Sequence, residues 1–468
     1  MRKSDGRELL GLDATFALLY SVCVIEGADI QLLPASFKAL ERDLGLSPSD
    51  LAILAMSQAI AQFASGLFWG ALADGGWSRK WMLTGGATSW GCLTLLLALV
   101  SDFPTMVGLR MLNGAALGVL QPVAQSLTVD MTQPCERGFF FGWMQLNMQA
   151  GVLIAAIGAA SVSNLQILGF AGWRVAFAAV SVASLILAAV LAAFMKEPKR
   201  SFASDHSISF AREIRKCHRY LRIPTFRVIV LQGLFGSIPW SALAFAILFF
   251  QNSGLSDFHA SVTFAASIAG GGIGGVLGGW IGDRLSQWSR NHGRPLTAQV
   301  SVAAGIPLIA MILSVVPREP TSFSTYFGLM FVFGLVSSWC AAGVNRPILA
   351  EIVGARDRAS VFAWLVAMDG AFAALFGAPV VGMLAEHVFG YQPSELLATD
   401  MPLSLRASNA SALSQAMLCC TVGPWTVCFL FYSFLHLTYG PDVAASSELE
   451  SADMQQEEKK GTVTSALV

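Results

Sequence analysis

Apolar stretches of about 20 residues, each long enough to cross the hydrocarbon core of a bilayer, recur along the whole 468-residue chain. A backbone in hydrocarbon must satisfy its own hydrogen bonds, so these stretches predict helices. The alternating pattern of a membrane β-barrel is absent. We expect six membrane helices on each side of a central polar break, over residues 14–37, 49–73, 80–101, 103–129, 139–162 and 171–195, then 227–251, 259–283, 295–316, 324–350, 359–388 and 412–438.

Segments of the second half repeat segments of the first. GALAD at residues 70–74 recurs as GWIGD at 279–283, and Asp130, which precedes Arg137, corresponds to Glu351, which precedes Arg358. Internal repeats in a very apolar chain are typical of secondary transporters, whose substrate sites lie where the repeats meet. We expect hydrogen bonds between acidic helix ends and loop arginines to form a cytoplasmic gate, built from Gly70, Asp74, Arg79, Asp130, Arg137, Gly279, Asp283, Glu351 and Arg358.

The predicted fold is an all-α polytopic membrane protein of two pseudo-symmetric six-helix bundles, residues 14–195 and 227–438. Residues 1–13 are an N-terminal tail without a removable signal peptide. Residues 196–226 link the bundles through a basic amphipathic helix that would bind anionic membrane lipid, unless it is simply a solvated linker helix. Residues 439–468, rich in Ser, Glu, Gln and Lys, are predicted to be disordered.

Composition agrees with a membrane protein. Hydrophobic residues make up 54% of the chain and charged residues 13%, against roughly 25% charged in soluble domains. The bias of lysine and arginine among the loops predicts that both termini are cytoplasmic. A net charge of −1 gives no reason to expect nucleic-acid binding, and the cysteines form no metal or disulfide pattern, so we expect no cofactor, no metal and no enzymatic activity.

Two motifs resemble the major facilitator superfamily, which is built from two six-helix bundles around a cavity that opens alternately to each side. The family's loop motif G-x-L-x-D-R-x-G-R-R is matched, apart from Gly75 and Trp77, at Gly70, Leu72, Asp74, Gly76, Arg79 and Lys80. Its fourth-helix pattern is matched in full by Arg110, Leu112, Gly114, Gly118 and Pro122.

Within that superfamily the chain resembles a plant and algal group of spinster-related carriers that is described by an unfertilized-embryo-sac phenotype. The resemblance is carried by residues 28–34, 239–245 and 345–353, among others. This group usually has charged residues early in the eleventh helix, where this chain has Leu365 and Val366. The group has no assigned substrate, so the resemblance implies an architecture and a transport class alone.

Ionisable residues inside membrane spans are expensive and point to function. Glu26 and Asp29 lie three residues apart on one helix face. Two carboxylates this close in a low dielectric do not both ionise easily, which suits a proton-coupling site, although one of them could instead pair structurally. Arg110 would stabilise Asp29, bind a substrate anion or form a fixed ion pair.

Other polar residues inside the spans are candidates for the cavity wall, although interhelical hydrogen bonding explains each of them equally well. They are Gln121, Gln125, Gln145, Gln149, Gln232, Trp240, Asn345, Arg346 and Asp369. We therefore interpret the chain as a monomeric secondary active or facilitative carrier of a small organic or amphipathic solute, working by alternating access and coupled to protons.

The alternative is a non-transporting membrane sensor or scaffold that retains the transporter fold. An acidic dileucine pattern ending at Leu9 and Leu10 leaves the plasma membrane and an endolysosomal or vacuolar membrane both open.

Overall fold

The computed structural model describes residues 6–74, 76–132, 137–197, 218–354, 358–398 and 400–465. The side chains of Asp74, Arg137 and Arg358 lie outside the described part of the chain, and so do the gate contacts predicted for them. The predicted amphipathic linker helix also falls mostly on residues that are not described.

The first half consists of helices joined by short connections, with a small β-hairpin of two two-residue strands before its last helix. Its elements are α1 (Gly6–Ala35), α2 (Phe37–Leu44), α3 (Pro48–Asp74), α4 (Arg79–Leu99), α5 (Phe103–Leu117), α6 (Leu120–Met131), α7 (Arg137–Ser163), the antiparallel strands β1 (Gln166–Ile167) and β2 (Phe170–Ala171), and α8 (Gly172–Phe194).

The second half repeats this plan with more interruptions. Its elements are α10 (Pro224–Ala242), η1 (Leu243–Phe245), α11 (Ala246–Asn252), α12 (Asp257–Trp288), α13 (Gly293–Ser314), η2 (Pro320–Ser322), α14 (Phe323–Ser337), the π-helical turn η3 (Ala341–Asn345), α15 (Arg346–Ile352), α16 (Arg358–Phe376), α17 (Ala378–Met383), the π-helical turn η4 (Leu384–Val388) and α18 (Leu403–Ser465).

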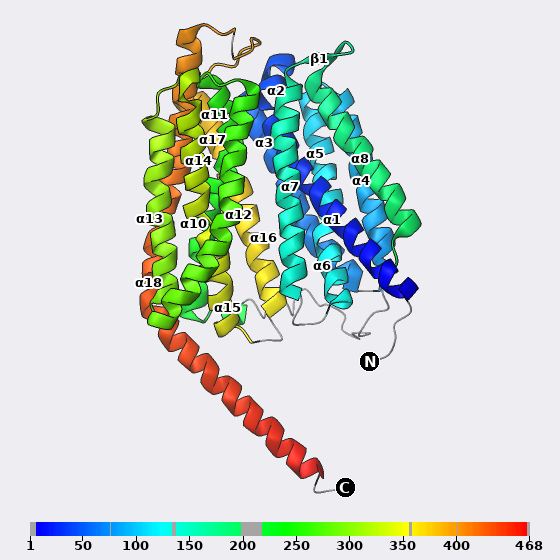
Figure 1. The fold of residues 1–468 in the computed structure, drawn as a ribbon, viewed down its shortest axis with the longest axis vertical. Helices are drawn as coiled ribbons and strands as arrows, with labels where there is room; N and C mark the ends of the chain where they lie inside the picture. Colours follow the sequence, from blue (N-terminus) through cyan, green and yellow to red (C-terminus); the bar gives the residue numbers. More distant parts are fainter. Residues whose placement is uncertain are drawn as a thin grey trace.

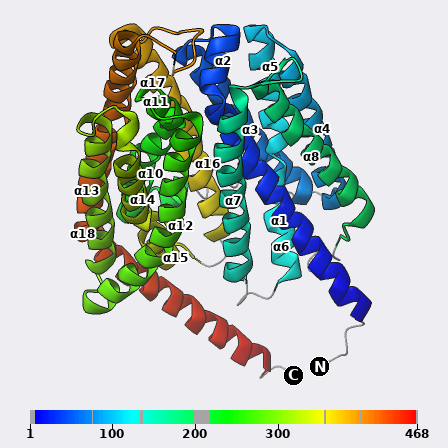
Figure 2. The same ribbon diagram turned by 45° about the horizontal axis from the view of Figure 1, so that its top comes forward.

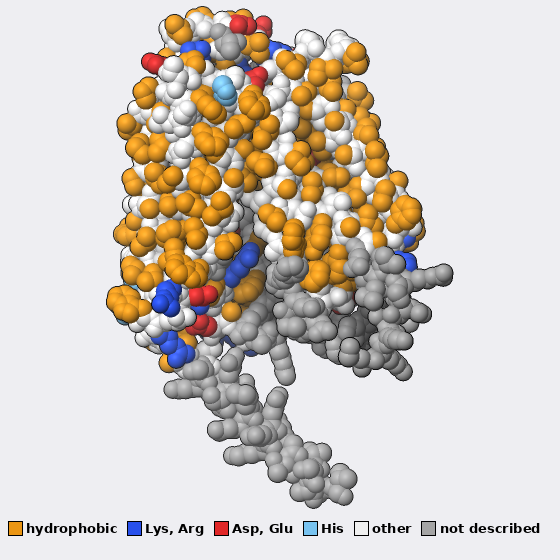
Figure 3. All heavy atoms as spheres, in the orientation of Figure 1, with side chains coloured by type: hydrophobic (Ala, Val, Ile, Leu, Met, Phe, Trp, Pro, Cys, Tyr) orange, Lys and Arg blue, Asp and Glu red, His pale blue; other side chains and the backbone are white. Residues whose placement is uncertain are grey.

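Within the described residues, twelve helical segments are long and apolar enough to cross a membrane. They form two bundles that stand side by side, with the start of α1 and the end of α18 at the same end (Figures 1 and 2). Figure 3 shows a broad hydrophobic belt, while most charged side chains gather at the two ends. The predicted two-bundle membrane fold is confirmed.

Four predicted helices are interrupted rather than continuous. The span predicted at 103–129 divides after Gly118, and the span predicted at 359–388 divides at Gly377, just before Pro379. Proline lacks the amide hydrogen that would continue the helical ladder, and a lipid-buried backbone tolerates such breaks where neighbouring helices pack against them. Periodicity alone gives no sign of where a long apolar run is divided.

The predicted disorder of residues 439–468 is wrong as far as Ser465, because α18 continues as a helix to that residue. A helix that already exists in the membrane needs no new nucleation, so propagation adds a hydrogen bond for each further residue. The Glu, Gln, Lys, Ala and Met of this segment have high helix propensity. Similarly, α1 begins at Gly6, inside the predicted N-terminal tail.

The two halves meet through α3 against α16 and α17, and through α7 against α12. Small residues allow this close approach: at Gly382, a Cβ atom would come within 2.6 Å of the Pro48 carbonyl oxygen on α3. This interface leaves α7 beside the second bundle, where it closes a cavity described below.

The glycine-rich helix α12 uses one face to pack against α14 and the π-helical turn η3. A Cβ atom at Gly270 or Gly274 would collide with the carbonyl oxygen of Phe331 or Leu335, respectively, whereas a Cβ at Gly275 would meet nothing within 4 Å. The glycines are therefore needed for close helix packing, which is how small residues spaced four apart act in membranes.

We expect Gly274→Ala to destabilise the protein by about 1–3 kcal/mol, the usual cost of overpacking. Gly275→Ala, one residue away, serves as the matched control and should be neutral or slightly stabilising because alanine has the higher helix propensity. Thermal unfolding of the purified variants in the same detergent measures the difference. Equal midpoints for the two variants would contradict this account of α12.

Candidate functional site

Asp29 on α1 lies at the centre of a buried hydrogen-bond network inside the first bundle. Its side chain is fully buried. Gln58 Nε2 on α3 donates to Asp29 Oδ2 at 2.7 Å, and Trp90 Nε1 on α4 donates to Asp29 Oδ1 at 2.9 Å. Both partners are neutral, so neither compensates the charge of an ionised carboxylate.

Glu26, one helical turn earlier, is 1% exposed and is also held by amides. Gln121 Nε2 on α6 donates to Glu26 Oε2 at 3.0 Å, and Gln62 Nε2 on α3 donates to Glu26 Oε1 at 3.4 Å. Gln125 in turn donates to Gln121 Oε1 at 3.1 Å. The two carboxylates are thus joined to three neighbouring helices through side chains that carry no charge.

Arg110 on α5 is 3% exposed, and its charge acts on Asp29. The described residues nevertheless form no ion pair with it within 4.0 Å, and its Nε and Nη1 atoms have no hydrogen-bond partner among them. The direct Asp29–Arg110 pair that the sequence suggested is not formed in this conformation, in which the Asp29 oxygens accept from Gln58 and Trp90.

A cavity of about 470 Å³ lies between α7 of the first half and the second bundle. Six of the residues predicted to line a cavity do line it: Gln145, Gln149, Gln232, Trp240, Asn345 and Asp369. Glu26, Asp29, Arg110, Gln121 and Gln125 do not line it, and Arg346 is exposed outside it. The polar set predicted from the sequence therefore separates into two places.

Aromatic rings form one wall of this cavity. Trp240 on α10 and Trp425 on α18 meet edge to face, with ring centroids 5.8 Å apart. Trp425 Nε1 donates to the Gly236 carbonyl oxygen at 3.3 Å, and Tyr432 OH donates to Asn345 Oδ1 at 3.0 Å. Sequence reasoning missed Trp425 and Tyr432, although their spacing of seven residues places them on one helix face.

Asp369 on α16 is the one carboxylate among the described residues that line the cavity. Its Oδ1 atom is buried without a hydrogen-bond partner among those residues. Gly233 makes room for it, since a Cβ there would lie 2.6 Å from Oδ1. Ser237 Oγ donates to the Asp369 backbone carbonyl rather than to its side chain, at 3.0 Å.

A charge cluster joins helix ends of the first half on the side where the described chain ends lie. Arg79 Nη1 at the start of α4 pairs with Asp130 Oδ2 at the end of α6, at 2.5 Å. Glu197 Oε1 accepts from the Arg79 backbone N–H at 3.0 Å. Burial alone would raise the pKa of Glu197, but hydrogen bonds from Ser78 Oγ and the Arg79 and Lys80 backbone lower it below its usual value of 4.5. Glu197 is therefore ionised at neutral pH.

The second half has a corresponding cluster around Arg294 at the start of α13. Arg294 Nη2 pairs with Asp283 Oδ1 at 3.0 Å, and its Nε lies 3.9 Å from Glu351 Oε1. Tyr439 OH donates to Glu351 Oε2 at 2.6 Å. Arg294 was not among the predicted gate residues, but the repeat could have identified it, because Arg294 and Arg79 each begin the third membrane helix of their half.

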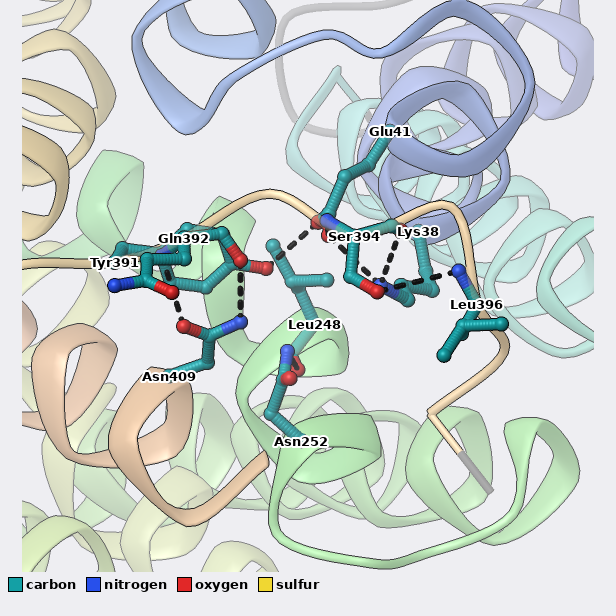
Figure 4. A network of polar contacts seen from close by, with 9 residues as sticks. All are labelled: Lys38, Glu41, Leu248, Asn252, Tyr391, Gln392, Ser394, Leu396 and Asn409. Atoms are coloured by element: carbon teal, nitrogen blue, oxygen red, sulfur yellow. Dashed lines mark hydrogen bonds and ion pairs between the residues drawn. The ribbon is translucent and has the colours of Figure 1, made fainter. Parts of the chain in front are cut away.

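At the opposite end, a buried ion pair on α2 holds the loop between η4 and α18 (Figure 4). Lys38 and Glu41 are 1% and 0% exposed, and Lys38 Nζ lies 2.7 Å from Glu41 Oε1. Glu41 also accepts from Tyr391 OH at 2.6 Å and from the Ser394 backbone N–H at 2.9 Å, while Lys38 donates to the Ser394 carbonyl at 3.2 Å. We call these four residues the outer clamp.

The outer clamp connects the two halves, because α2 belongs to the first and residues 391–394 to the second. Burial and the charge of Glu41 raise the pKa of Tyr391 well above 10, so its hydroxyl keeps the proton that it donates. A further link lies nearby, where Asn164 Nδ2 donates to Asp257 Oδ2 at 2.9 Å. Sequence analysis missed the clamp because it pairs residues some 350 positions apart.

Two six-helix bundles with an internal polar cavity and a clamp across one end define a membrane carrier of the alternating-access type. Comparison with known proteins agrees with this class. A sequence profile of the Major Facilitator Superfamily matches residues 19–346, and the chain belongs to that family.

Among characterised relatives, the 3-(3-hydroxy-phenyl)propionate transporter of Escherichia coli (strain K12) is 25% identical over 333 residues, 69% of this chain and 75% of the relative. Quinolone resistance protein NorA of Staphylococcus aureus (strain MRSA252) is 26% identical over 268 residues, 56% of this chain and 64% of NorA, less than two thirds of its length. The chain is thus similar to secondary transporters, and that predicted class is confirmed.

Solved structures show the same fold. An inward-facing, unoccupied bacterial homologue of the human lysosomal transporter Spinster superposes with a TM-score of 0.78 at 19% identity, covering 92% of this chain and 98% of that one. A D-xylose–proton symporter gives a TM-score of 0.66 at 15% identity, covering 90% and 96%. The spinster resemblance found in the sequence is supported at the level of the fold.

The outer clamp yields a test of what closes this end of the molecule. Glu41→Gln removes the counter-ion of a buried lysine, a change that typically costs 3–5 kcal/mol, and we expect it to open the end bearing α2. Asp43→Asn is the matched control, since Asp43 lies on the same helix but bonds Trp173 within the first half, at 2.8 Å.

The measurement is the rate at which a membrane-impermeant maleimide, added from the side bearing α2, modifies a single cysteine. The cysteine replaces Gln149 in the cavity wall, in a background without the native cysteines. We expect labelling at least about tenfold faster with Glu41→Gln, as 1.4 kcal/mol already corresponds to tenfold, and unchanged labelling with Asp43→Asn. Equal rates in all three proteins would mean that the clamp does not hold this end closed.

Proposed function

We propose that this carrier couples the movement of protons through the first bundle to transport of a small amphipathic organic solute bound in the cavity of the second. The observation that carries the proposal is the separation of the two polar sites. Glu26 and Asp29 are buried with neutral partners and do not line the cavity, whereas Asp369 does.

The carboxylate pair has the properties that proton coupling requires. Burial favours the neutral form of a carboxylate, whereas N–H hydrogen-bond donors favour its ionised form, so a carboxylate held in this way can take up or release a proton when its surroundings change. Arg110 supplies the opposing influence, because its buried charge favours an ionised Asp29. Asp29 lies on α1 and Arg110 on α5. Motion of α5 relative to α1 would therefore change the distance between them, and with it the balance between the neutral and ionised forms of the carboxylate.

The conformation supports alternating access. The outer clamp closes one end, while Figure 3 shows the surface hollowed between the two halves toward the other end. The charge clusters around Arg79 and Arg294 each stay within one half in this state. We assign them to the cytoplasmic gate, where they hold the helix ends that would meet when the carrier turns outward. A non-transporting sensor would have no need for a cavity with such a clamp.

The excess of lysine and arginine in the loops near the described chain ends supports our proposal that both termini are cytoplasmic, as the positive-inside rule predicts. A reporter that fluoresces only in the cytosol, fused after Val468, is expected to fluoresce. The same reporter inserted after Pro393, in the loop held by the outer clamp, should stay dark and is the control. A dark reporter after Val468 with a fluorescent one after Pro393 would invert the topology.

The function itself is tested by flux. Proteoliposomes that contain a trapped pH-sensitive dye are exposed to a library of small organic solutes, and proton movement on addition of each solute identifies substrates. We expect Asp29→Asn to abolish uptake driven by a proton gradient while sparing equilibrium exchange of substrate, because the neutral amide preserves the packing but binds no proton. Asp43→Asn should retain both activities.

Arg110→Ala should impair both activities, because it leaves the carboxylates without the one buried cation nearby and opens space in the bundle. Retention of full proton dependence in Asp29→Asn, Glu26→Gln and the double variant would exclude this pair as the coupling site, and Asp369 would then be the next residue to test. Absence of any solute flux across the library would instead favour the sensor.

A further inference from the structure

The cavity of the second bundle differs from the rest of the membrane domain in the balance of its charges. Among the described residues that line it there is one carboxylate, Asp369, and no lysine, arginine or histidine. Arg346 follows the lining residue Asn345 but is exposed outside the cavity, and Arg110 belongs to the separate network of the first bundle. A molecule that enters therefore meets one carboxylate, which can pair with a positive charge, and no basic side chain among these residues.

The Asp369 side chain is also incompletely satisfied by the protein. Its Oδ1 atom is buried against Gly233 and accepts no hydrogen bond from the described residues, and the Ser237 hydroxyl donates to the Asp369 backbone carbonyl rather than to its side chain. A buried carboxylate without a partner is unfavourable. A cationic group of a molecule bound in the cavity would compensate the charge of this carboxylate.

Some of the other polar groups of the wall have hydrogen-bond partners within the protein. Gln232 Nε2 donates to the Ile229 carbonyl at 2.8 Å, and Asn345 Oδ1 accepts from Tyr432. The wall also has aromatic faces: Trp240, which is 45% exposed, packs against Trp425, and both line the cavity. Aromatic faces attract cations, and attract them more strongly where water is excluded.

We propose, on the basis of the function inferred above, that the substrate is an amphipathic organic cation: an amine or quaternary ammonium group that pairs with Asp369, joined to an apolar body that packs on Trp240 and Trp425. A cavity of about 470 Å³ lies within the range of small-molecule sites. Organic anions find no counter-charge on the described wall and are excluded.

The test compares three probes that share a phenylbutyl body and end in a trimethylammonium, a hydroxyl or a carboxylate group. Their binding to the purified full-length carrier in lipid nanodiscs is measured by titration calorimetry. We expect the ammonium probe to bind at least about tenfold more tightly than the alcohol, and the carboxylate to bind more weakly than either.

Two variants test whether Asp369 causes the preference for the ammonium probe. Asp369→Asn keeps the shape of the side chain but removes its charge, so it should weaken ammonium binding at least about tenfold and leave alcohol binding unchanged. Glu395→Gln removes an exposed carboxylate in the loop beyond η4 and should change neither. Thermal unfolding of each variant, measured alongside, separates a lost contact from a lost fold.

A third variant separates this inference from the proposed function. Ala341→Phe fills the cavity from η3, where Ala341 lines the space and is exposed to it, and should block all three probes. Binding that survives Ala341→Phe would mean that the cavity is not the substrate site, which overturns the proposed function as well. If Ala341→Phe blocks the probes as expected, two results would overturn only the cationic substrate: equal or tighter binding of the carboxylate probe to the wild-type carrier, or an unchanged ammonium affinity in Asp369→Asn. Failure of the ammonium probe to bind the folded wild-type carrier would do the same.

Discussion

An ionised group inside a membrane bundle is stable only if other polar groups replace the water that it has lost, and the described part of this protein is arranged around that constraint. Lys38 and Glu41 satisfy it together, with all of the remaining contacts supplied by Tyr391 and Ser394. Because Tyr391 and Ser394 belong to the second half, the buried ion pair keeps these hydrogen bonds only while the two halves touch at this end, so separating the halves there would leave buried charges without partners.

The same constraint explains why the two other polar regions differ. Asp29 and Glu26 are surrounded by amides, which hydrogen bond to a carboxylate in either protonation state, so these positions tolerate a change of charge. Asp369 is not surrounded in this way, and one of its oxygens depends on whatever occupies the cavity. In the proposed mechanism the first site changes its proton content and the second binds the cargo.

Packing makes this arrangement possible. Glycines on α12 let α14 approach closely, and Gly233 lets the Asp369 carboxylate rest against α10. Helices that touch through small residues can rock against one another without opening large voids. The interruption at Gly377 lies at the interface between halves, the π-helical turn before Arg346 lines the cavity, and the break at Gly118 packs against α3 within the first bundle; non-helical backbone is tolerated in membranes where it is buried in protein in this way.

Much of this molecule was determined by local sequence. The length of the apolar stretches was sufficient to predict the twelve helices, because the bilayer permits few alternatives to a helix. The repeat between residues 70–74 and 279–283 predicted the two bundles, and the family motif ending at Pro122 added the transporter class. The same reasoning identified Glu26, Asp29 and Asp369 as unusual, since charge in an apolar run is visible without coordinates.

Only the tertiary structure decided which of these residues meet. It separated Asp29 from Asp369, paired Arg294 with Asp283 and Glu351, and joined Glu41 to Tyr391 across the whole chain. It also extended α18 beyond its membrane span to Ser465. These outcomes depend on the rotation of each helix about its axis and on the contact between bundles, which are set by packing among many residues distant in sequence, and no local pattern records them.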